Sequence, residues 1–475
     1  MSPGPPRDGT ATGGPKRLGM ISLGCAKNLV DSEVMLGHLE AAGWQFVRDP
    51  SEADVIVVNT CSFIGPAREE SIRAILEAAE YKRTGRLERL VVAGCMVQRY
   101  PDELRRELPE VDAFVGLDQL HRIVEVAYRG DGAPARLPTS PAAAPLAETS
   151  DATTHGNPAS YLYDDTSPRR LATPPWTAYV KIAEGCDHTC AFCAIPSFRG
   201  AFRSRTPGSV LREVRGLVAQ GVREINLIAQ DSGHYGRDLD RREGLAELLR
   251  ELDRFEALRW VRVHYLYPNT VTSRLIETMA GGRRILDYVD LPLQHAHPDV
   301  LRRMRRGGSA TSHLRLLSRF RGAMPDVTLR STFIVGFPGE TEEEFVRLLD
   351  FVREVRFDHL GVFVYSHEEG TQAYSLADDV PESVKQERRD RLMSCQQRIA
   401  FERNRAWVGR CEEVLVEGAH PETDHLLVGR MRSQAPDVDG QVLINEGTAR
   451  PGEFATVSLT DTAGYDLVGG IVGTA

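Results

Sequence analysis

Short apolar runs that end in a cysteine recur three times in the first part of the chain. Each run is aliphatic or β-branched, and a small or polar residue separates it from the cysteine. Helical spacing of apolar residues follows the first two runs, at 28–39 and 67–81. Such runs are typical of strands buried on both faces, and strands that alternate with helices build a parallel, doubly wound sheet. The pattern predicts an N-terminal α/β domain over residues 16–129. Its strands are expected in Leu18–Cys25, Ala53–Cys61 and Leu87–Cys95.

A second alternation of strands and helices fills the middle of the chain. This periodicity is typical of a β/α barrel, complete or partial, whose functional residues lie at the carboxyl ends of the strands. One helix is expected at 213–219, and a long charged helix at 382–407 ends the pattern, so we assign residues 172–403 to this domain. The expected strands are 177–183, 224–231, 261–267, 288–295, 327–340 and 359–365.

The last segment changes to short strands with turn residues between them. Five such strands predict a small β-barrel over residues 404–475. Segment 401–475 contains six arginines, no lysine and twelve acidic residues, a balance of −6. Because a nucleic-acid-binding surface should be basic, this barrel is better suited to a basic protein partner.

Two stretches are poor in large apolar residues. Residues 1–15 are rich in Gly, Pro and Thr and lack the apolar core of a signal peptide, so we expect a disordered tail. Residues 130–171 are rich in Pro, Ala, Thr and Ser, which is a linker composition. No apolar run approaches the length needed to cross a bilayer. These features predict a cytoplasmic protein, and in that reducing compartment the presence of eight cysteines favours ligand roles over disulfides.

The densest chemistry in the sequence is a cysteine loop ahead of the second alternation. Cys186, Cys190 and Cys193 lie within eight residues, spaced C-x3-C-x2-C. Thiolates are ligands that iron–sulfur clusters and zinc prefer. A closed zinc site needs four ligands, and His188 is available as the fourth. The cluster alternative is favoured because no second CxxC follows at zinc-finger spacing and because the aromatic Phe192 precedes the third cysteine.

Cys25, Cys61 and Cys95 share one position, at the end of a predicted strand. Because ligand sites of parallel sheets lie at the carboxyl ends of strands, the fold should bring these three thiols to one edge as a second metal site. The alternative is three small buried residues, since a free cysteine packs well as an apolar group. Cys395 and Cys411 have no spaced partner, and we interpret them as packing thiols.

The spacing C-x3-C-x-aromatic-C resembles the signature of radical S-adenosylmethionine enzymes. The resemblance implies a [4Fe–4S] cluster on the three central cysteines, with S-adenosylmethionine on its open iron and Phe192 near the adenine. Segment Gly336–Glu340 resembles the glycine-bearing turn that borders the cofactor, and Gln230 at a strand end is a further candidate cofactor-binding residue. Glycine turns and polar strand ends are also common without a ligand. His295 is either such a polar group or a buried structural histidine.

The two sets of cysteines together resemble the methylthiotransferases, a branch of these enzymes with two clusters. Segment Ser22–Glu33 looks like the opening of that family's first domain, with Asn28, Asp31 and Glu33 at its polar positions. Helix capping and first-turn acid placement are the alternative for these residues. The resemblance implies a second [4Fe–4S] cluster on the N-terminal cysteines, a partial barrel open on one side and a terminal TRAM domain.

Within that family the chain looks like the branch that modifies an aspartate of small-subunit ribosomal protein twelve, a very basic protein. The similarity includes Ser22–Glu33, Tyr265–Pro268 and Ala435–Gly440. It implies that S-adenosylmethionine supplies a radical, which abstracts hydrogen from the aspartate β-carbon, and also a methyl group, while the second cluster delivers sulfur. An electron donor and a sulfur source are implied as partners.

Other functions stay open at this point. The chain could modify an adenosine of transfer RNA, carry iron–sulfur clusters without catalysis, or bind RNA through its terminal barrel. The basic run Arg302–Arg306 is either a solvated helix face or a phosphate contact. The net charge of −9 gives no support to chain-wide nucleic-acid binding, so direct nucleic-acid binding is not favoured but stays open. Because no apolar run is long enough to span a bilayer, we expect no membrane association.

Overall fold

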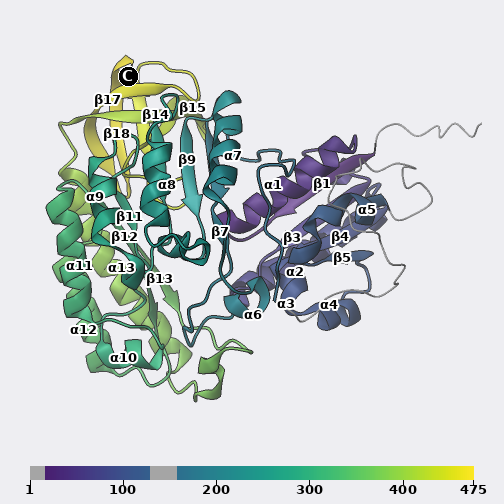
Figure 1. The fold of residues 1–475 in the computed structure, drawn as a ribbon, viewed down its shortest axis with the longest axis horizontal. Coiled ribbons are helices and arrows are strands. Elements are labelled where there is room, and N and C mark those ends of the chain that lie inside the picture. Colours follow the sequence, from purple (N-terminus) through teal and green to yellow (C-terminus); the bar gives the residue numbers. More distant parts are fainter. Residues whose placement is uncertain (1–15, 129–157, 475) are drawn as a thin grey trace, which may run out of the picture. The chain divides into compact units, whose positions relative to one another are not determined.

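The computed structural model describes residues 16–128 and 158–474 (Figure 1). The expected tail, 1–15, and residues 130–157 of the expected linker lie outside the described residues. No helix in the described part of the chain combines the length and apolar character that a membrane span requires. The chain forms two compact units, which comprise residues up to Tyr161 with Ser167–Arg170, and Leu162–Thr166 with Leu171–Ala475.

The first unit is built on a five-stranded sheet in which every strand pair is parallel, in the order β2-β1-β3-β4-β5. Strand β3, with the sequence VIVVNT, is buried at every position because helices cover both faces of the sheet. The predicted doubly wound α/β domain is therefore confirmed. The strands are β1 Arg17–Ser22, β2 Gln45–Phe46, β3 Val55–Thr60, β4 Arg89–Gly94 and β5 Ala113–Val115.

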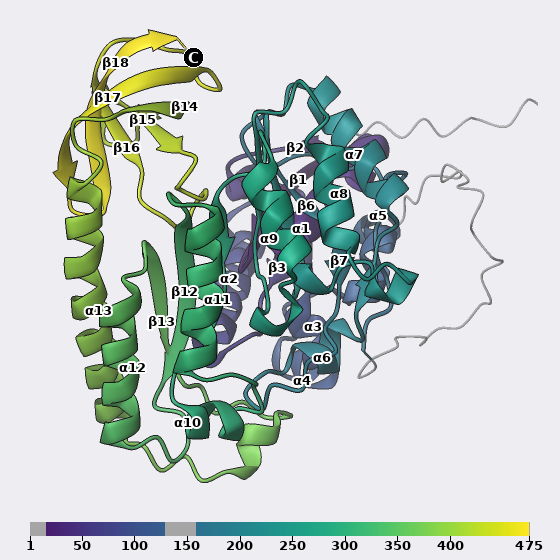
Figure 2. The ribbon, with the colours of Figure 1, turned by 60° about the vertical axis from the view of Figure 1, so that its left-hand side comes forward.

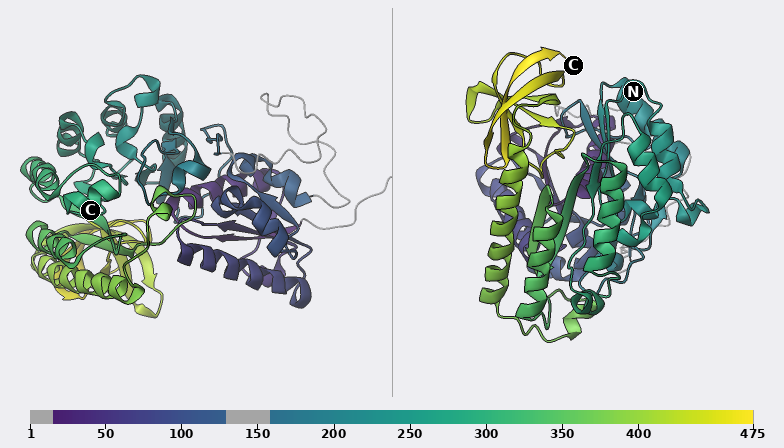
Figure 3. Two further views of the ribbon diagram at one scale, coloured as in Figure 1. Left: turned by 90° about the horizontal axis from the view of Figure 1, so that it is seen from below. Right: turned by 90° about the vertical axis from the view of Figure 1, so that its left-hand side faces the viewer.

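The helices of the first unit divide between the two faces of this sheet. Helix α1 contacts α5, whereas α2 and α3 contact β3 and β4. Figure 3 (left) shows α1 and α2 on opposite sides of the strands. The helices are α1 Ala26–Ala41, α2 Gly65–Thr84, α3 Cys95–Arg99, α4 Pro101–Glu107 and α5 Ile123–Tyr128.

The second unit begins with six parallel strands in two sheets, ordered β10-β9-β6 and β11-β12-β13. A parallel bridge between Val261 and Ile285 joins the two sheets. No strand pairing links β6 to β13 within the described residues, so the barrel is partial and open on one side. This confirms the predicted partial β/α barrel. The strands are β6 Thr177–Lys181, β9 Glu224–Ile228, β10 Trp260–Val263, β11 Tyr288–Asp290, β12 Thr328–Val335 and β13 His359–Val364.

Helices cover the outer surface of the partial barrel (Figures 1 and 2). The helix expected at 213–219 begins earlier, at Pro207, because the Thr206 side chain caps it by accepting from the amide of Ser209. The helices are α7 Pro207–Ala219, α8 Gly244–Leu252, α9 Ser273–Gly281, α10 Pro298–Arg303, α11 Ala310–Ala323, α12 Glu342–Val355 and α13 Glu382–Arg405. Sequence periodicity did not predict a short antiparallel pair with two residues in each strand, β7 Ala183–Glu184 and β8 Arg203–Ser204. The segment between these strands contains the cysteine loop and α6 Ile195–Arg199.

The last strands close into a barrel in the order β14-β15-β16-β18-β17, which confirms the predicted C-terminal β-barrel. Its core is aliphatic and includes Val414, Val442, Val457 and Leu467. The strands are β14 Cys411–His420, β15 Thr423–Met431, β16 Val442–Glu446, β17 Phe454–Ala463 and β18 Asp466–Thr474.

A buried ionic network connects this barrel to the amino ends of the parallel strands. Glu224 on β9 accepts from Arg262 on β10 and from Arg430 on β15, the latter at 2.7 Å, and none of the three side chains is more than 4% exposed. Burial alone would raise the pKa of Glu224, but the two guanidinium groups hold it well below its usual range. Nearby, Tyr288 Oη donates to Asp439 at 2.7 Å. The segment after β15 is therefore anchored at the amino ends of the strands, opposite the end that carries the predicted site.

Replacing Glu224 with glutamine should destabilise the second unit by about 3–5 kcal/mol, because two buried arginines then lose their carboxylate. Chemical denaturation of the variant against wild type checks this. Glu247→Gln is the matched control, since its pair with Arg241 is about half exposed and should contribute less than about 1 kcal/mol. Equal effects of the two substitutions would contradict a stabilising role for the network.

The described end of the expected linker, residues 158–171, makes specific contacts. Arg169 forms an ion pair with Glu33 of α1, at 2.5 and 3.0 Å, and both side chains are nearly buried. The helix-capping alternative for Asn28 is wrong, because Cys25 occupies the N-cap. Asn28 Nδ2 instead donates to Leu23 O at 2.7 Å and Asn59 Nδ2 donates to Asn28 O at 2.9 Å, so Asn28 ties the turn after β1 to β3.

Candidate functional site

The three N-terminal cysteines lie at one edge of the first unit's sheet. Strands β1, β3 and β4 are neighbours, and Cys25, Cys61 and Cys95 follow their carboxyl ends by one to three residues. Their exposure decreases in that order, from exposed through half-buried to buried. The packing around Gly24 is close: it has φ +89°, and a Cβ there would lie 3.0 Å from Cys61 Sγ. Parallel topology thus brings together thiols that are up to 70 residues apart in sequence.

The central cysteine loop is held by backbone hydrogen bonds within the second unit. Cys186 N donates to Gly200 O at 3.0 Å, across the mouth of the loop. Ala191 N donates to Met304 O and Ala191 O accepts from Ala373 N, each at 2.8 Å. Two segments that are distant in sequence therefore hold the middle of the loop in place. Gly185 has φ +80°, and a Cβ there would lie 2.1 Å from Ala201 O, so only glycine fits.

The environment of these thiols fits a cluster better than a zinc ion. The only three His, Cys, Asp or Glu side chains in the described residues whose ligand atoms all lie within 4.8 Å of one another are His297, Asp299 and Glu344, so the three sulfurs are spread more widely than that. Tetrahedral zinc, with bonds of about 2.3 Å, needs sulfurs about 3.8 Å apart. A cubane cluster accommodates a wider set.

His188, the proposed fourth zinc ligand, has other partners. Its Nε2 lies 2.7 Å from Asp231 Oδ2, and its ring stacks on Tyr267 with centroids 3.8 Å apart. Burial raises the pKa of Cys186 to about 11 and of Cys193 to about 12, with Cys190 adding to both shifts. Such thiols stay protonated until a metal centre displaces the protons.

The three candidate cofactor residues lie at the same end of the partial barrel as the cysteine loop. Gln230 follows β9 and Gly336 follows β12, while Phe192 packs against a buried cluster that contains Phe337 and Tyr365. Gly336 has φ +73°, and a Cβ there would lie 2.3 Å from Lys385 Cγ, so α13 packs directly on this glycine turn. The structure therefore brings these residues to one end, as expected for the carboxyl edge of a β/α barrel.

Glu184 organises this end of the barrel and was not identified from the sequence. Its carboxylate accepts from Lys181 Nζ at 2.7 Å, Arg199 Nη1 at 2.8 Å and Gln230 Nε2 at 2.5 Å. Burial alone would raise the pKa of Glu184, but Arg199 and Lys181 lower it well below its usual range. The Gln230 amide is thereby oriented, and its Oε1 is buried without a hydrogen-bond partner among the described residues. A charged residue at the end of an otherwise apolar strand was the available signal in the sequence.

The glycine turn is held by a buried carboxylate. Glu340 Oε2 accepts from the amides of Gly336 at 2.7 Å and Phe337 at 3.2 Å, and Arg388 Nη1 donates to Oε1 at 3.2 Å. His295 is fully buried, with Nε2 4.0 Å from Glu340, and burial lowers the pKa of His295 to about 3. The structural alternative for His295 therefore fits its environment.

Stability should fall as pH rises through the titration range of Glu340. Burial, opposed by Arg388 and the two amides, raises the pKa of Glu340 to about 7. Between the unfolded value of about 4.3 and that value, the folded protein keeps a proton that the unfolded chain has lost, which favours folding most at the acid end. Across this pH window the free energy of unfolding of the wild-type protein should fall by about 3 kcal/mol, and that of Glu340→Gln should not show this decrease. Denaturant midpoints at about pH 5 and about pH 8 measure the difference.

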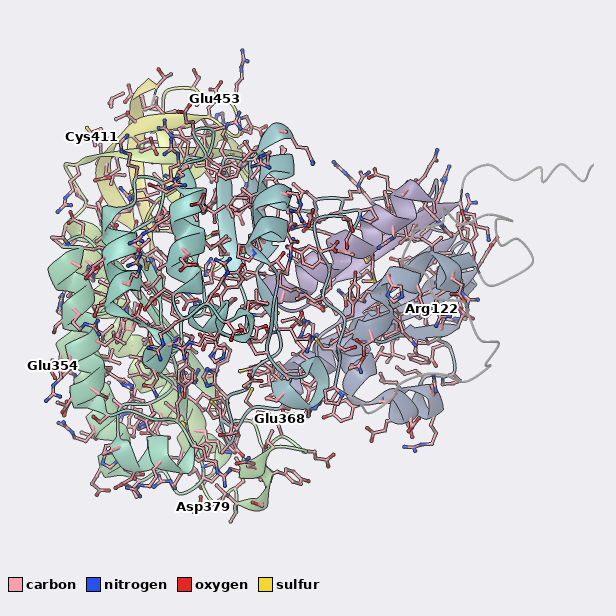
Figure 4. The ribbon with its side chains drawn as sticks, in the orientation of Figure 1. Arg122, Glu354, Glu368, Asp379, Cys411 and Glu453 are labelled. Carbon is pink, nitrogen blue, oxygen red and sulfur yellow. The ribbon has the colours of Figure 1, made fainter. Side chains whose placement is uncertain are left out.

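Glu354→Gln is the matched control for this titration, because Glu354 is exposed on α12 (Figure 4). The control should follow the wild-type pH dependence. If Glu340→Gln also follows it, the protonated state of the buried carboxyl is not what stabilises the turn at low pH.

The basic run Arg302–Arg306 does not form a single solvated helix face, because α10 ends at Arg303. Arg302 pairs with Asp299, and Arg303 Nη2 donates to Glu344 at 2.7 Å. Arg306 is only 8% exposed and turns toward the cysteine loop, where its Nη1 lies 3.5 Å from Cys190 Sγ. The run therefore places one buried charge beside the central thiols.

Comparisons with known proteins agree with this arrangement. Three family models match: the Uncharacterized protein family UPF0004 at residues 17–116, the Radical SAM superfamily at 180–352 and the TRAM domain at 408–472. In fold, the chain is similar to the radical S-adenosylmethionine methyltransferase TsrM from Kitasatospora setae. The TM-score is 0.53 at 15% identity, over 74% of this chain and 72% of that one.

The sequence relatives cover nearly the whole chain. A protein named ribosomal protein uS12 methylthiotransferase RimO, from Geobacter sulfurreducens, is 48% identical over 96% of this chain and 99% of its own length. Its namesake from Solibacter usitatus is 49% identical, over 95% and 94% of the two chains. Another, from Anaeromyxobacter, is 48% identical over 96% and 93%. The chain belongs to the RimO family of methylthiotransferases and is a radical S-adenosylmethionine enzyme that uses an iron–sulfur cluster.

Proposed function

We propose that this protein inserts a methylthio group at the β-carbon of an aspartate in small-subunit ribosomal protein uS12. The observation that carries the proposal is the pair of cysteine sets at strand carboxyl ends, in a chain 48% identical to RimO along nearly its full length. A ribosomal substrate implies that the protein acts in the cytoplasm.

The two cysteine sets would hold two [4Fe–4S] clusters, one on Cys186, Cys190 and Cys193 and one on Cys25, Cys61 and Cys95. When bound, a reduced cluster supplies the electron that cleaves S-adenosylmethionine to a radical able to abstract hydrogen from an unactivated carbon. Three thiolates per cluster would leave one iron open in each set, for S-adenosylmethionine at the central site and for sulfur at the other. Support for the central set comes from its wide spacing and from the engagement of His188 elsewhere.

Phe192, Gln230 and Gly336 would bind S-adenosylmethionine beside the central cysteines. Glu184 orients the Gln230 amide so that the buried, unpartnered Oε1 can accept from an amino group of the cofactor. Gly336 exposes backbone in a turn that Glu340 holds in place. Phe192 offers an apolar face for a flat ring. At Gln230 and Gly336, these roles predict that binding is set by rigid groups at strand ends.

The terminal barrel would contact the basic substrate. Segment 401–475 has a balance of −6, and acidic side chains such as Glu453 are exposed on the barrel (Figure 4). Opposite charge favours encounter with a basic protein and disfavours RNA. An electron donor and a sulfur source complete the set of proposed partners, because one electron is consumed per cofactor cleavage and the inserted sulfur must be replaced.

Intact mass spectrometry of uS12 from cells with and without this gene tests the proposal. We expect loss of a methylthio-sized increment that maps to one aspartate when the gene is absent. An unchanged uS12 mass would overturn the proposed substrate, and the hypermodified adenosine of transfer RNA would be analysed next.

A second measurement separates the enzyme from a non-catalytic cluster carrier. The reconstituted protein should release 5′-deoxyadenosine from S-adenosylmethionine when dithionite supplies electrons. A protein that binds iron and sulfide but never cleaves the cofactor would be a carrier.

A further inference from the structure

Arg306 is a nearly buried cation that has no counter-ion among the described residues. Its neighbours in the run have carboxylates: Arg302 pairs with Asp299 and Arg303 with Glu344. For Arg306, the described residues provide no acidic partner. Its Nη2 donates to the carbonyl of Pro292, its Nη1 faces a sulfur, and its Nε is buried without a partner. Burying an unpaired charge is costly, so a compensating negative group is expected beside it.

The guanidinium is held in a fixed stack. Arg306 lies over the Tyr267 ring at 4.2 Å, and His188 stacks on the same ring with a centroid separation of 3.8 Å. Two groups that both lie about 4 Å from one ring centroid must occupy opposite faces, so Tyr267 is sandwiched between them. Asp231, in turn, fixes His188 and accepts from Thr270 Oγ1 at 3.1 Å. The orientation of the Arg306 guanidinium is thus set by successive contacts with Tyr267, His188 and Asp231, the last of which follows β9.

The Arg306 guanidinium, at one end of this stack, faces the central thiols. Arg306 Nη1 lies 3.5 Å from Cys190 Sγ, which is hydrogen-bond distance for sulfur. A hydrogen bond and a fixed positive charge at a ligand sulfur are two of the means by which proteins tune cluster potentials.

We propose that Arg306 is a positioning residue that holds its charge against the Cys190 thiolate and raises the reduction potential of the centre bound by Cys186, Cys190 and Cys193. The inference rests on the proposed function of these cysteines. Reduction adds one electron to a site that already carries three thiolates, and a fixed cation beside one of them favours the reduced state. The same contact would supply the negative group that this nearly buried arginine does not find in an acidic side chain of the described residues.

The test is the midpoint potential of the reconstituted cluster in Arg306→Gln, Arg306→Lys and wild type, followed by electron paramagnetic resonance during dithionite titration. Arg306→Gln should lower the equilibrium constant for reduction about tenfold or more, which for one electron is a shift of about −59 mV or more. Arg306→Lys keeps the charge and should recover most of the shift. Arg302→Gln, on the exposed side of the same run, is the control and should match wild type.

Iron content and cofactor affinity separate the alternatives. If Arg306→Gln loses iron, restored iron in Arg306→Lys supports the charge role, and equal loss in both variants overturns it. Weaker S-adenosylmethionine binding at an unchanged potential would assign Arg306 to the cofactor carboxylate and overturn the inference. If the wild-type protein holds no cluster on the central cysteines, the proposed cofactor site is wrong. If wild type and Arg306→Gln both hold the cluster and have equal midpoint potentials, only the role of Arg306 is wrong.

Discussion

Replacing Cys190 with alanine is expected to abolish both 5′-deoxyadenosine formation and methylthio transfer. Cys190 is the middle cysteine of the central loop and a proposed cluster ligand. Its sulfur is the one that Arg306 faces, and its carbonyl accepts from Cys193 N at 3.1 Å. Loss of a ligand should exceed the roughly 10–100-fold loss typical when only an outer partner of a ligand is removed. Chromatography of 5′-deoxyadenosine and mass spectrometry of the uS12 product measure the two activities.

Cys411→Ala is the matched control for this variant. Cys411 lies at the start of β14 on the terminal barrel and is exposed, so its interpretation as a packing thiol is wrong (Figure 4). Its loss should leave both activities at the wild-type level. Cofactor cleavage that persists in Cys190→Ala would remove this cysteine from the proposed cluster site.

Replacing Cys61 with alanine should separate the two activities. The 5′-deoxyadenosine yield should stay at the wild-type level, whereas methylthio transfer should be lost. The physical reason is that Cys61 is positioned by the sheet of the first unit, directly after β3, while the hydrogen bonds that hold the central loop come from the second unit. Removing one thiol from the first sheet edge leaves those bonds intact.

Iron analysis makes the Cys61 experiment decisive. The variant should retain about half of the wild-type iron if each set of three thiolates holds one cluster. Equal loss of cofactor cleavage and methylthio transfer would count against separate roles for the two sites. Full wild-type iron would show that Cys61 is a packing thiol, as its sequence alone also allowed.

The elements that carry the cysteines could be predicted because their signals are local. The run Val55–Thr60 is β-branched and apolar, which predicts a buried parallel strand, and the cysteine that follows it then falls at a carboxyl end. The C-x3-C-x2-C spacing is likewise contained in eight residues. Very short elements were less predictable. Strands β7 and β8 have two residues each, which is too few to show the alternation of apolar and polar residues that predicts a strand.

The partners of buried charges could not be predicted in this way. Arg302–Arg306 is one basic run in sequence, yet Arg302 and Arg303 form ion pairs with carboxylates and Arg306 is a nearly buried cation beside a thiol. His295 and Gln230 are both polar strand ends, but one is a fully buried structural histidine and the other is oriented by a carboxylate. Sequence reports residue type and spacing, and neither fixes which side of a turn faces a neighbour.

By itself, the sequence determined the class of each domain, the six cysteines at strand ends and in the loop, and the acidic balance of the terminal barrel. Hydrophobic periodicity and ligand spacing are properties of neighbouring residues, so they can be interpreted before the chain folds. Only the tertiary structure decided the pairing of Glu224 with Arg430, 206 residues apart, the role of Glu184 and the direction of Arg306. Each depends on elements distant in the chain meeting in a low-dielectric interior, where a charge must find its partner in space.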